Sequence, residues 1–288
     1  MRAGELVQPD SLTVLGQVYH MIEPKQAPSA SQGGGAQGGN SAGNKPVKPN
    51  LQIVYLDQEI VVINKPPGLT TSRNSRDLKE FGPKAKEFLP PTAADWLPQF
   101  LPSKQRVFPV HRIDRETSGV LVFALNVKTA AKLAKMFKAH ALKRSYLALT
   151  RNVPPDGTIS NELVRDRGDG RRGSGSPGEP AVTKVEVVET RDWGALVRCT
   201  LETGRTHQVR IHLAEAGAPL CGEKIYDRPL HGKPFKDPSE APRIMLHAHL
   251  LAFAHPTTGK PLHFEVDPPS DFQKVLKRMR SSGQRGRG

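Results

Sequence analysis

Residues 111–125 read HRIDRETSGVLVFAL, a charged loop that leads directly into an apolar run. The run Val120–Leu125 contains no polar side chain, which is typical of a strand buried within a sheet. Asp114 lies on the loop just before this strand. A carboxylate on a loop that is anchored by a buried strand is held in a fixed direction, as a catalytic group must be. This stretch therefore predicts a central strand with a candidate catalytic residue, Asp114, at its entrance.

Two arginines, Arg112 and Arg115, flank Asp114. Opposite charges within about 4 to 6 Å favour the ionised form of a carboxyl group, so this setting would keep Asp114 charged and nucleophilic. The same Arg-Ile-Asp-Arg pattern is also typical of an ion-pair cluster on the surface, which contributes little to stability. The charge pattern alone leaves both interpretations open.

The composition indicates a polyanionic partner. The 288 residues include 42 Lys and Arg against 28 Asp and Glu, a formal net charge of +14, and phosphates bound by such cations release their condensed counterions. No apolar run approaches the roughly 20 residues needed to span a bilayer, and the first residues lack the pattern of a secretory signal. The two cysteines, Cys199 and Cys221, are too few for a disulfide scaffold. We therefore expect a cytoplasmic protein that does not associate with membranes.

The chain divides into three parts by composition. Residues 1–49 are predicted to be a flexible N-terminal segment, because from about residue 27 they are rich in Gly, Ser, Ala, Gln, Asn and Pro and cannot bury enough apolar surface. Residues 50–270 are predicted to be one folded domain. Residues 271–288 are predicted to be a basic tail, whose early part could close a helix and whose last residues could contact RNA backbone.

The predicted domain mixes strands and helices and is expected to be a largely antiparallel α+β sheet. A helix should follow Asn126 as its cap, and a second short helix should begin at Thr206 and stop at Gly217. The remaining periodic runs predict strands and hairpins. These strand predictions are Gln52–Leu56, Ile60–Asn64, Val120–Leu125, Ser145–Thr150, Val182–Val188, Ala195–Leu201, Ile244–Phe253 and Leu262–Val266.

Several motifs in a fixed order carry a resemblance to a known family. The run HRIDRETSGVLVFALN is similar to the signature HRLDxxTSGLLVxAK of the RluA family of pseudouridine synthases, with Ile113 in place of the usual Leu. Further segments resemble that family's other motifs, although Glu179 stands where Lys is usual. These segments are Asn64–Gly68, Lys143–Ala148, Gly178–Thr183, Thr203–Leu213, Pro219–Tyr226, Leu246–Ala248 and Phe253–Pro256.

The resemblance implies a pseudouridine synthase fold, which is a mostly antiparallel mixed sheet with flanking helices and a central active-site cleft. It also implies a reaction, the isomerisation of uridine in RNA to pseudouridine without cofactor or metal. Asp114 matches the family's catalytic aspartate, which acts covalently. Sequence does not decide between attack on the ribose anomeric carbon and assistance in forming a glycal intermediate. The target uridine must be flipped out of its stack to reach this residue.

Four substrate-binding residues follow from the same resemblance. Arg112 matches an arginine that can fill the space left by the flipped base, with a plain phosphate contact as the alternative. Tyr146 matches the active-site tyrosine, whose ring can stack on uracil and whose hydroxyl can help move a proton. Arg205 matches the basic residue that pairs with the catalytic carboxylate, whereas His207 and Arg210 could contact phosphate. Leu246 is either the apolar floor under the base or a packing residue.

Two other classes of function are alternatives to this one. The histidines His207, His212, His247 and His249 form neither an HExxH nor a Cys-His zinc pattern, so we expect no metal site. A non-catalytic RNA-binding protein on a synthase scaffold is the other alternative, and the presence of Asp114 together with its expected partners argues against it. The expected partner is a structured RNA, ribosomal or transfer, bound by a monomer. The arginines of residues 165–172 should contribute to this binding.

Overall fold

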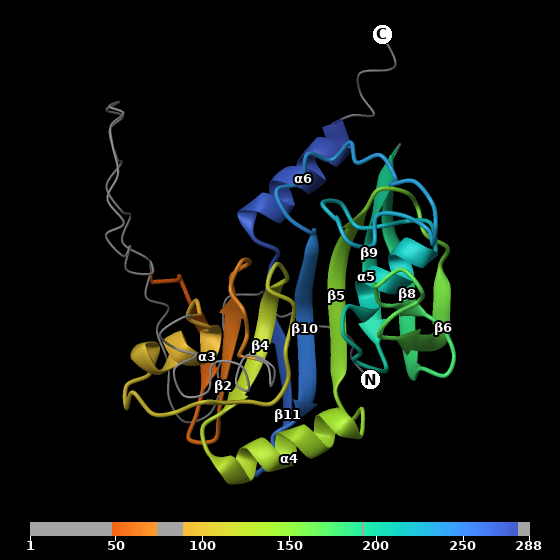
Figure 1. Cartoon of the computed structure of the whole chain (residues 1–288). Coiled ribbons are helices and arrows are strands. Elements are labelled where there is room, and N and C mark those ends of the chain that lie inside the picture. The colour runs from red at the N-terminus through yellow and green to blue at the C-terminus, as the bar shows by residue number, and fades with distance from the viewer. Residues whose placement is uncertain (1–47, 74–88, 192, 282–288) are drawn as a thin grey trace, which may run out of the picture. The chain divides into compact units, whose positions relative to one another are not determined.

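The computed structural model describes residues 48–73, 89–191 and 193–281. The expected flexible segment 1–49 lies almost entirely outside these residues, as does the end of the expected tail, 282–288. Within the described residues, eleven strands form one mixed sheet in the order β1-β2-β4-β10-β5-β9-β8-β6-β7, with β3 beside β4 and β11 beside β10 (Figure 1). The strands are β1 Gln52–Leu56, β2 Ile60–Lys65, β3 Phe108–Pro109, β4 Ser118–Ala124, β5 Lys143–Thr150, β6 Gly157–Val164, β7 Gly173–Ser174, β8 Glu179–Arg191, β9 Gly194–Leu201, β10 Leu246–Ala254 and β11 Pro261–Glu265.

Every pair of neighbouring strands is antiparallel except β4 and β10, which run parallel. The predicted α+β sheet is therefore confirmed. At the parallel contact Gly119 pairs with Ala248, and a Cβ atom at Gly119 would lie 2.2 Å from the Ala248 carbonyl oxygen. Only glycine allows this approach and the positive φ of +115° at this position. Gly119 therefore lets β4 pair with β10 just after the Asp114 loop.

Among the described residues, three longer helices pack on the sheet, and each does so through residues at helical spacing. Helix α4, Val127–Lys138, begins where predicted, since the Asn126 side chain accepts a hydrogen bond from the Thr129 amide at 2.8 Å. Its Leu133 is fully buried with residues of β2, β4, β10 and β11. Helix α5, Gln208–Glu215, packs Val209 and Leu213 against β8 and β9. The short helices α3, Ala93–Trp96, and η2, Leu97–Phe100, cover another part of the sheet.

Helix α6, Ser270–Ser281, shows that the packed domain extends past the expected boundary at residue 270. Phe272, Val275, Leu276 and Met279 are buried against a cluster that includes Met245. This i, i+3, i+4, i+7 spacing forms one apolar face. The early part of the predicted tail therefore forms a helix, as the sequence allowed, and this helix packs with the folded body.

The start of α5 also differs from the prediction. The residue that precedes the helix is His207, in the left-handed region with φ of 61°, and not Thr206. The Gln208 side chain accepts the backbone amide of Arg205 at 3.0 Å, so this amide is satisfied without a Thr206 cap. The predicted stop at Gly217 is confirmed by its positive φ of 77°.

Candidate active site

The loop that carries Asp114 is fixed by two buried cations. Lys65 Nζ donates a hydrogen bond to the Arg115 carbonyl at 3.2 Å, and Arg243 Nη1 donates one to the Glu116 carbonyl at 2.9 Å. The Thr117 amide closes the turn by donating to the Asp114 carbonyl at 3.1 Å. Backbone atoms directly after Asp114 are therefore tied to β2 on one side and to the start of β10 on the other, which gives the carboxylate a defined position.

Lys65 is fully buried at the end of β2 and joins two loops. Besides the Arg115 carbonyl, its ammonium group binds the carbonyls of Pro66 at 2.9 Å and Leu69 at 2.8 Å. Burial and the positive charge of Arg243 together lower the pKa of Lys65 to about 7, although the charges of Asp114 and Glu116 oppose the shift. The lysine of the Asn64–Gly68 motif thus has a structural role, since it connects that motif to the loop of Asp114.

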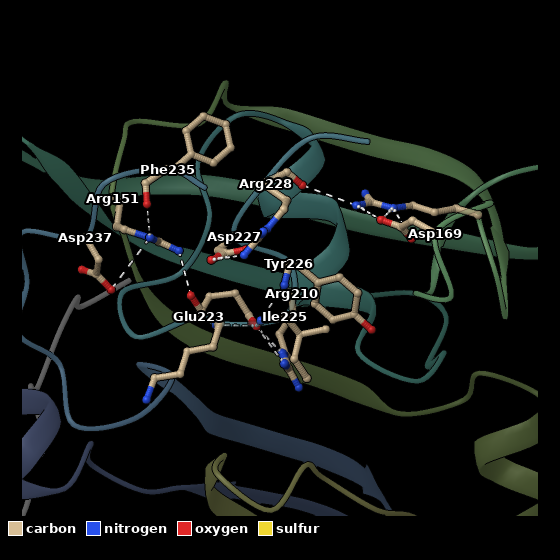
Figure 2. A network of polar contacts seen from close by, with 12 residues as sticks. Arg151, Asp169, Arg210, Glu223, Ile225, Tyr226, Asp227, Arg228, Phe235 and Asp237 are labelled. Atoms are coloured by element: carbon tan, nitrogen blue, oxygen red, sulfur yellow. Dashed lines mark hydrogen bonds and ion pairs between the residues drawn. The ribbon is translucent and has the colours of Figure 1, made fainter. Parts of the chain in front are cut away.

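Arg210 is the cation that holds Asp114. Its Nη1 donates to Asp114 Oδ2 at 3.2 Å. Its Nε and Nη2 form a fork on the Glu223 carboxylate at 2.7 and 2.9 Å, and Figure 2 shows this pair. The Arg210 side chain is 7% exposed and that of Glu223 is fully buried. Burial alone would lower the pKa of Arg210, but the hydrogen bonds and charges of the two carboxylates raise it above its ordinary value. Arg210 therefore stays charged between two anions.

This geometry corrects the expected role of Arg205. Arg205 Nε donates to the Pro180 carbonyl at 2.9 Å, and Nη1 forms an ion pair with Glu179 at 3.3 Å. The physical reason is its position before α5, beside the first residues of β8, whereas Arg210 lies inside α5. The carboxylate Glu179, which replaces a usual lysine, gives Arg205 an anion of its own. The expected pairing of Arg205 with Asp114 is therefore wrong, and Arg210 takes that role.

His207 lies near the second oxygen of the Asp114 carboxylate and contacts Tyr226. His207 Nε2 lies 3.7 Å from Asp114 Oδ1, and its Nδ1 forms a hydrogen bond with Tyr226 Oη at 2.8 Å. Burial lowers the pKa of His207, and burial raises the pKa of Tyr226 to about 12. Both groups are therefore neutral near pH 7. Among the described residues, Oδ1 thus has a neutral neighbour beyond hydrogen-bond range.

Tyr146 and Leu246 come from neighbouring strands beside the Asp114 loop. Tyr146 on β5 is opposite Ala248 on β10, and Leu246 on β10 is opposite Ala148 on β5. Both pack on the same apolar cluster. Tyr146 is half-buried, and this burial raises the pKa of its hydroxyl, with Arg144 opposing the shift and Asp114 adding to it. The structure therefore places Tyr146 and Leu246 on adjacent strands, and Tyr146 lies close enough to Asp114 for the charge of that carboxylate to act on its hydroxyl.

A family model described as RNA pseudouridylate synthase matches residues 59–215, which is more than half of the chain. The chain belongs to the RNA pseudouridylate synthase family. The resemblance that the sequence motifs indicated is thereby confirmed. The match spans all of the elements from β2 to α5, and so includes Asp114, Tyr146 and Arg210.

Individual relatives agree with this assignment. Ribosomal large subunit pseudouridine synthase D of Neisseria meningitidis serogroup B is 33% identical over 247 residues, which are 80% of this chain and 61% of that protein. tRNA pseudouridine synthase C of Vibrio cholerae is 34% identical over 241 residues, which are 78% of this chain and 94% of that protein. The solved structure of human RNA pseudouridylate synthase domain containing 1 has a TM-score of 0.60 and 25% identity, covering 83% of this chain and 98% of that one. The chain spans about three fifths of the length of the large-subunit relative.

The remaining expected residues of this synthase-family site differ in how firmly they are held. Arg112 is exposed next to Asp114, so its side chain can reach a bound molecule, and its role in RNA binding stays a prediction. Leu246 is 4% exposed and packs in the core, which is the packing alternative, while contact with a base also stays a prediction. Sequence analysis assigned no role to Glu223, although the Pro219–Tyr226 motif contains it.

The histidines that raised the question of a metal have structural partners. His247 forms hydrogen bonds with the Ser118 hydroxyl and the Val266 carbonyl, both at 2.9 Å. His212 Nε2 lies 2.9 Å from the Asn161 side-chain oxygen. Within the residues that the structure describes, no group of three or more His, Cys, Asp or Glu side chains is arranged to hold a metal ion.

None of the helices in the described part of the chain is long and apolar enough to cross a membrane.

Proposed function

We propose that this protein isomerises specific uridines in RNA to pseudouridine, with Asp114 as the catalytic carboxylate. The observation that carries the proposal is the Asp114–Arg210 pair at 3.2 Å. One oxygen of the carboxylate is oriented by a buried guanidinium, while the other faces a neutral histidine and is open to substrate. A fixed, charged carboxylate with one free oxygen suits covalent or proton-transfer chemistry at a sugar.

The reaction conserves all atoms of the uridine. The bond between the ribose anomeric carbon and N1 of uracil breaks, the base turns, and a bond forms between the same carbon and C5. The proton lost from C5 is balanced by one gained at N1, so no oxidant, reductant or co-substrate is consumed. Asp114 either bonds to the anomeric carbon or removes a ribose proton to give a glycal. In both routes its carboxylate must be ionised at the start, and Arg210 orients it through the hydrogen bond to Oδ2.

The substrate must be presented as an unstacked nucleotide. Flipping a base out of its stack requires a few kcal/mol, and the surplus of positive charge supports binding to the phosphate backbone. We propose that the exposed Arg112 contacts the RNA at the position left by the base and that Tyr146 stacks on the uracil. We further propose structured ribosomal or transfer RNA as the substrate, because relatives of both kinds match the chain.

A cytoplasmic setting and a monomer complete the proposal. Cys199 and Cys221 are both free and buried, and burial raises the pKa of each thiol to about 12. Such thiols suit a reducing compartment, where no disulfide is needed for stability.

The test is pseudouridine mapping of total RNA from the source cell with the gene intact, deleted, and restored as Asp114→Ala. The expected result is a uridine that loses its modification in the deletion and stays unmodified with the variant. Purified protein should then modify a transcript that contains this site. Restoration of the modification by Asp114→Ala would overturn the catalytic role, and failure to find any lost site together with an inactive purified enzyme would favour a binding protein.

A further inference from the structure

The segment between α5 and β10 contributes to the site without any helix or strand of its own. Residues 221–243 are irregular. They nevertheless carry Glu223, whose carboxylate accepts hydrogen bonds from Arg210, and Tyr226, whose hydroxyl forms a hydrogen bond with His207. A connection of this length in a compact domain is uncommon and is usually functional. Because it has no ladder of backbone hydrogen bonds, other groups must hold it in the position that the site requires.

Arg151 provides such a hold. It directly follows β5, is 4% exposed, and points its guanidinium into the segment (Figure 2). Nε donates to the Leu220 carbonyl at 3.1 Å, Nη2 to the Glu223 carbonyl at 3.0 Å, and Nη1 to the Phe235 carbonyl at 2.9 Å. One planar fork therefore ties the start of the segment to Phe235 further along it, and Asp237 lies 3.9 Å away as a weaker ion-pair partner.

The contact with Glu223 leads directly to the catalytic carboxylate. Arg151 fixes the backbone of Glu223, and the Glu223 side chain accepts hydrogen bonds from Arg210 Nε and Nη2. Arg210 in turn donates to Asp114. Next to Glu223, Gly222 has φ of 78°, and a Cβ atom there would lie 1.9 Å from the Arg243 carbonyl oxygen. The backbone at Glu223 thus has little freedom once Arg151 is in place.

We propose that Arg151 is a positioning residue for catalysis, which acts on Asp114 through Glu223 and Arg210. The inference rests on the proposed pseudouridine synthase activity. Its physical basis is the shape of the guanidinium, which presents several donors in a rigid fork and so can fix three carbonyls at once. A lysine has a single nitrogen at the end of a flexible stem and cannot reproduce this spread of contacts.

Replacing Arg151 should slow the chemical step and leave the binding of RNA largely unchanged. Without Arg151 the Glu223 backbone gains freedom and Arg210 loses its fixed anchor, so the carboxylate is misaligned although RNA can still dock. Small misplacements of catalytic groups lower rates by up to about 100-fold. We expect Arg151→Met to lower kcat by about 10- to 100-fold with KM changed less than about threefold, and Arg151→Lys to fall between this variant and the wild type.

The matched control is Leu133→Ala in α4, a buried side chain that packs in a different cluster. Both variants lower the melting temperature, so both are assayed well below it on the transcript that mapping identifies. A purely structural role would give the two variants equal kcat per folded molecule, and that result would overturn the proposal. Where Arg151→Met does not fold, Arg151→Lys carries the test, and an unchanged kcat for it overturns the proposal as well.

A double-mutant cycle tests the route through Glu223. When Arg151 acts through Glu223, Arg151→Met adds little to the loss of kcat caused by Glu223→Gln, because the contact it supports is already lost. Losses that multiply would show that Arg151 acts elsewhere and would overturn the inference. Wild-type protein that forms no pseudouridine in any RNA would instead overturn the proposed function. The two failures are therefore distinguishable.

Discussion

Replacing Arg210 by methionine should destabilise the protein in a way that depends on Glu223. The Glu223 side chain is fully buried, and Arg210 is its charged partner at 2.7 Å. Removing one member of a buried ion pair leaves the other uncompensated, and this typically costs about 3–5 kcal/mol of unfolding free energy. Asp114 also loses a partner, but its side chain is 21% exposed and water can solvate it. Glu223 should therefore dominate the effect.

The free energy of unfolding of Arg210→Met, compared with that of the wild type, should depend on pH in a defined direction. In the native protein, burial raises the pKa of Glu223, but the hydrogen bonds and charge of Arg210 outweigh this and lower it overall. Without Arg210, burial prevails and the folded-state pKa rises above its unfolded value near 4.5. The unfolded state then binds fewer protons than the folded state between these two values. The variant should therefore become more stable relative to the wild type as the pH falls from 7.5 toward 5.5.

Urea denaturation of four proteins at both pH values measures this prediction. The proteins are the wild type, Arg210→Met, Glu223→Gln and the double variant. Because the double variant buries no unpaired charge, it should recover at least about 2 kcal/mol of the loss at pH 7.5, while its activity stays absent. Two results would refute the reasoning, namely a loss below about 1 kcal/mol for Arg210→Met, or single losses that simply add in the double variant.

Three further predictions concern individual residues. Asp114→Asn should lower pseudouridine formation at least about 10³-fold while the affinity for RNA, measured by filter binding, stays the same, and weakened binding would contradict a purely chemical role. Arg205→Ala should change kcat less than about fivefold, because Arg205 contacts Glu179 and the Pro180 carbonyl rather than Asp114, whereas a loss of kcat equal to that of Arg210→Ala would indicate that Arg205 acts on Asp114 after all. Lys65→Met should alter how stability depends on pH, because the buried lysine has a pKa of about 7 and the folded state therefore penalises its charge. Between pH 7.5 and 9 the wild type should gain about 2 kcal/mol relative to this variant, and parallel stability curves would contradict the low pKa.

Local patterns predicted most of the sheet because they report on the physical causes of strands and caps. The uninterrupted apolar run Val120–Leu125 became β4, and Asn126 capped α4 because a free side-chain oxygen before a helical run satisfies an orphan amide. Helix α6 was harder to recognise. Its apolar face alternates with lysines and arginines, so its composition resembled a solvated tail although its spacing was that of a packed helix.

The catalytic pair could be predicted only in part. The sequence placed Asp114 before a buried strand. The Thr203–Leu213 motif contains two arginines, Arg205 and Arg210, and its sequence alone does not show which of them contacts Asp114. Their roles depend on where α5 begins, and helix boundaries are the least certain part of such a prediction. Glu223 could not be found from pattern alone, because it follows α5 in an irregular segment and meets Arg210 only through the tertiary fold. Arg151 could not be recognised from the sequence either, because its hydrogen bonds to Leu220, Glu223 and Phe235 form only in the tertiary fold.

The unequal sharing of Arg210 explains why a buried glutamate accompanies Asp114, the residue that we propose as catalytic. Glu223 takes the two-pronged contact at 2.7 and 2.9 Å, and Asp114 receives one N–H at 3.2 Å. A two-pronged pair between Arg210 and Asp114 would engage both oxygens of the carboxylate and stabilise its resting state, which would reduce its reactivity toward a sugar. Because Glu223 occupies the fork, Arg210 can orient Asp114 through Oδ2 and leave Oδ1 free. On this reasoning Glu223→Gln weakens the charge that competes for the fork, so it should impair catalysis even in a protein that folds and still contains both Asp114 and Arg210.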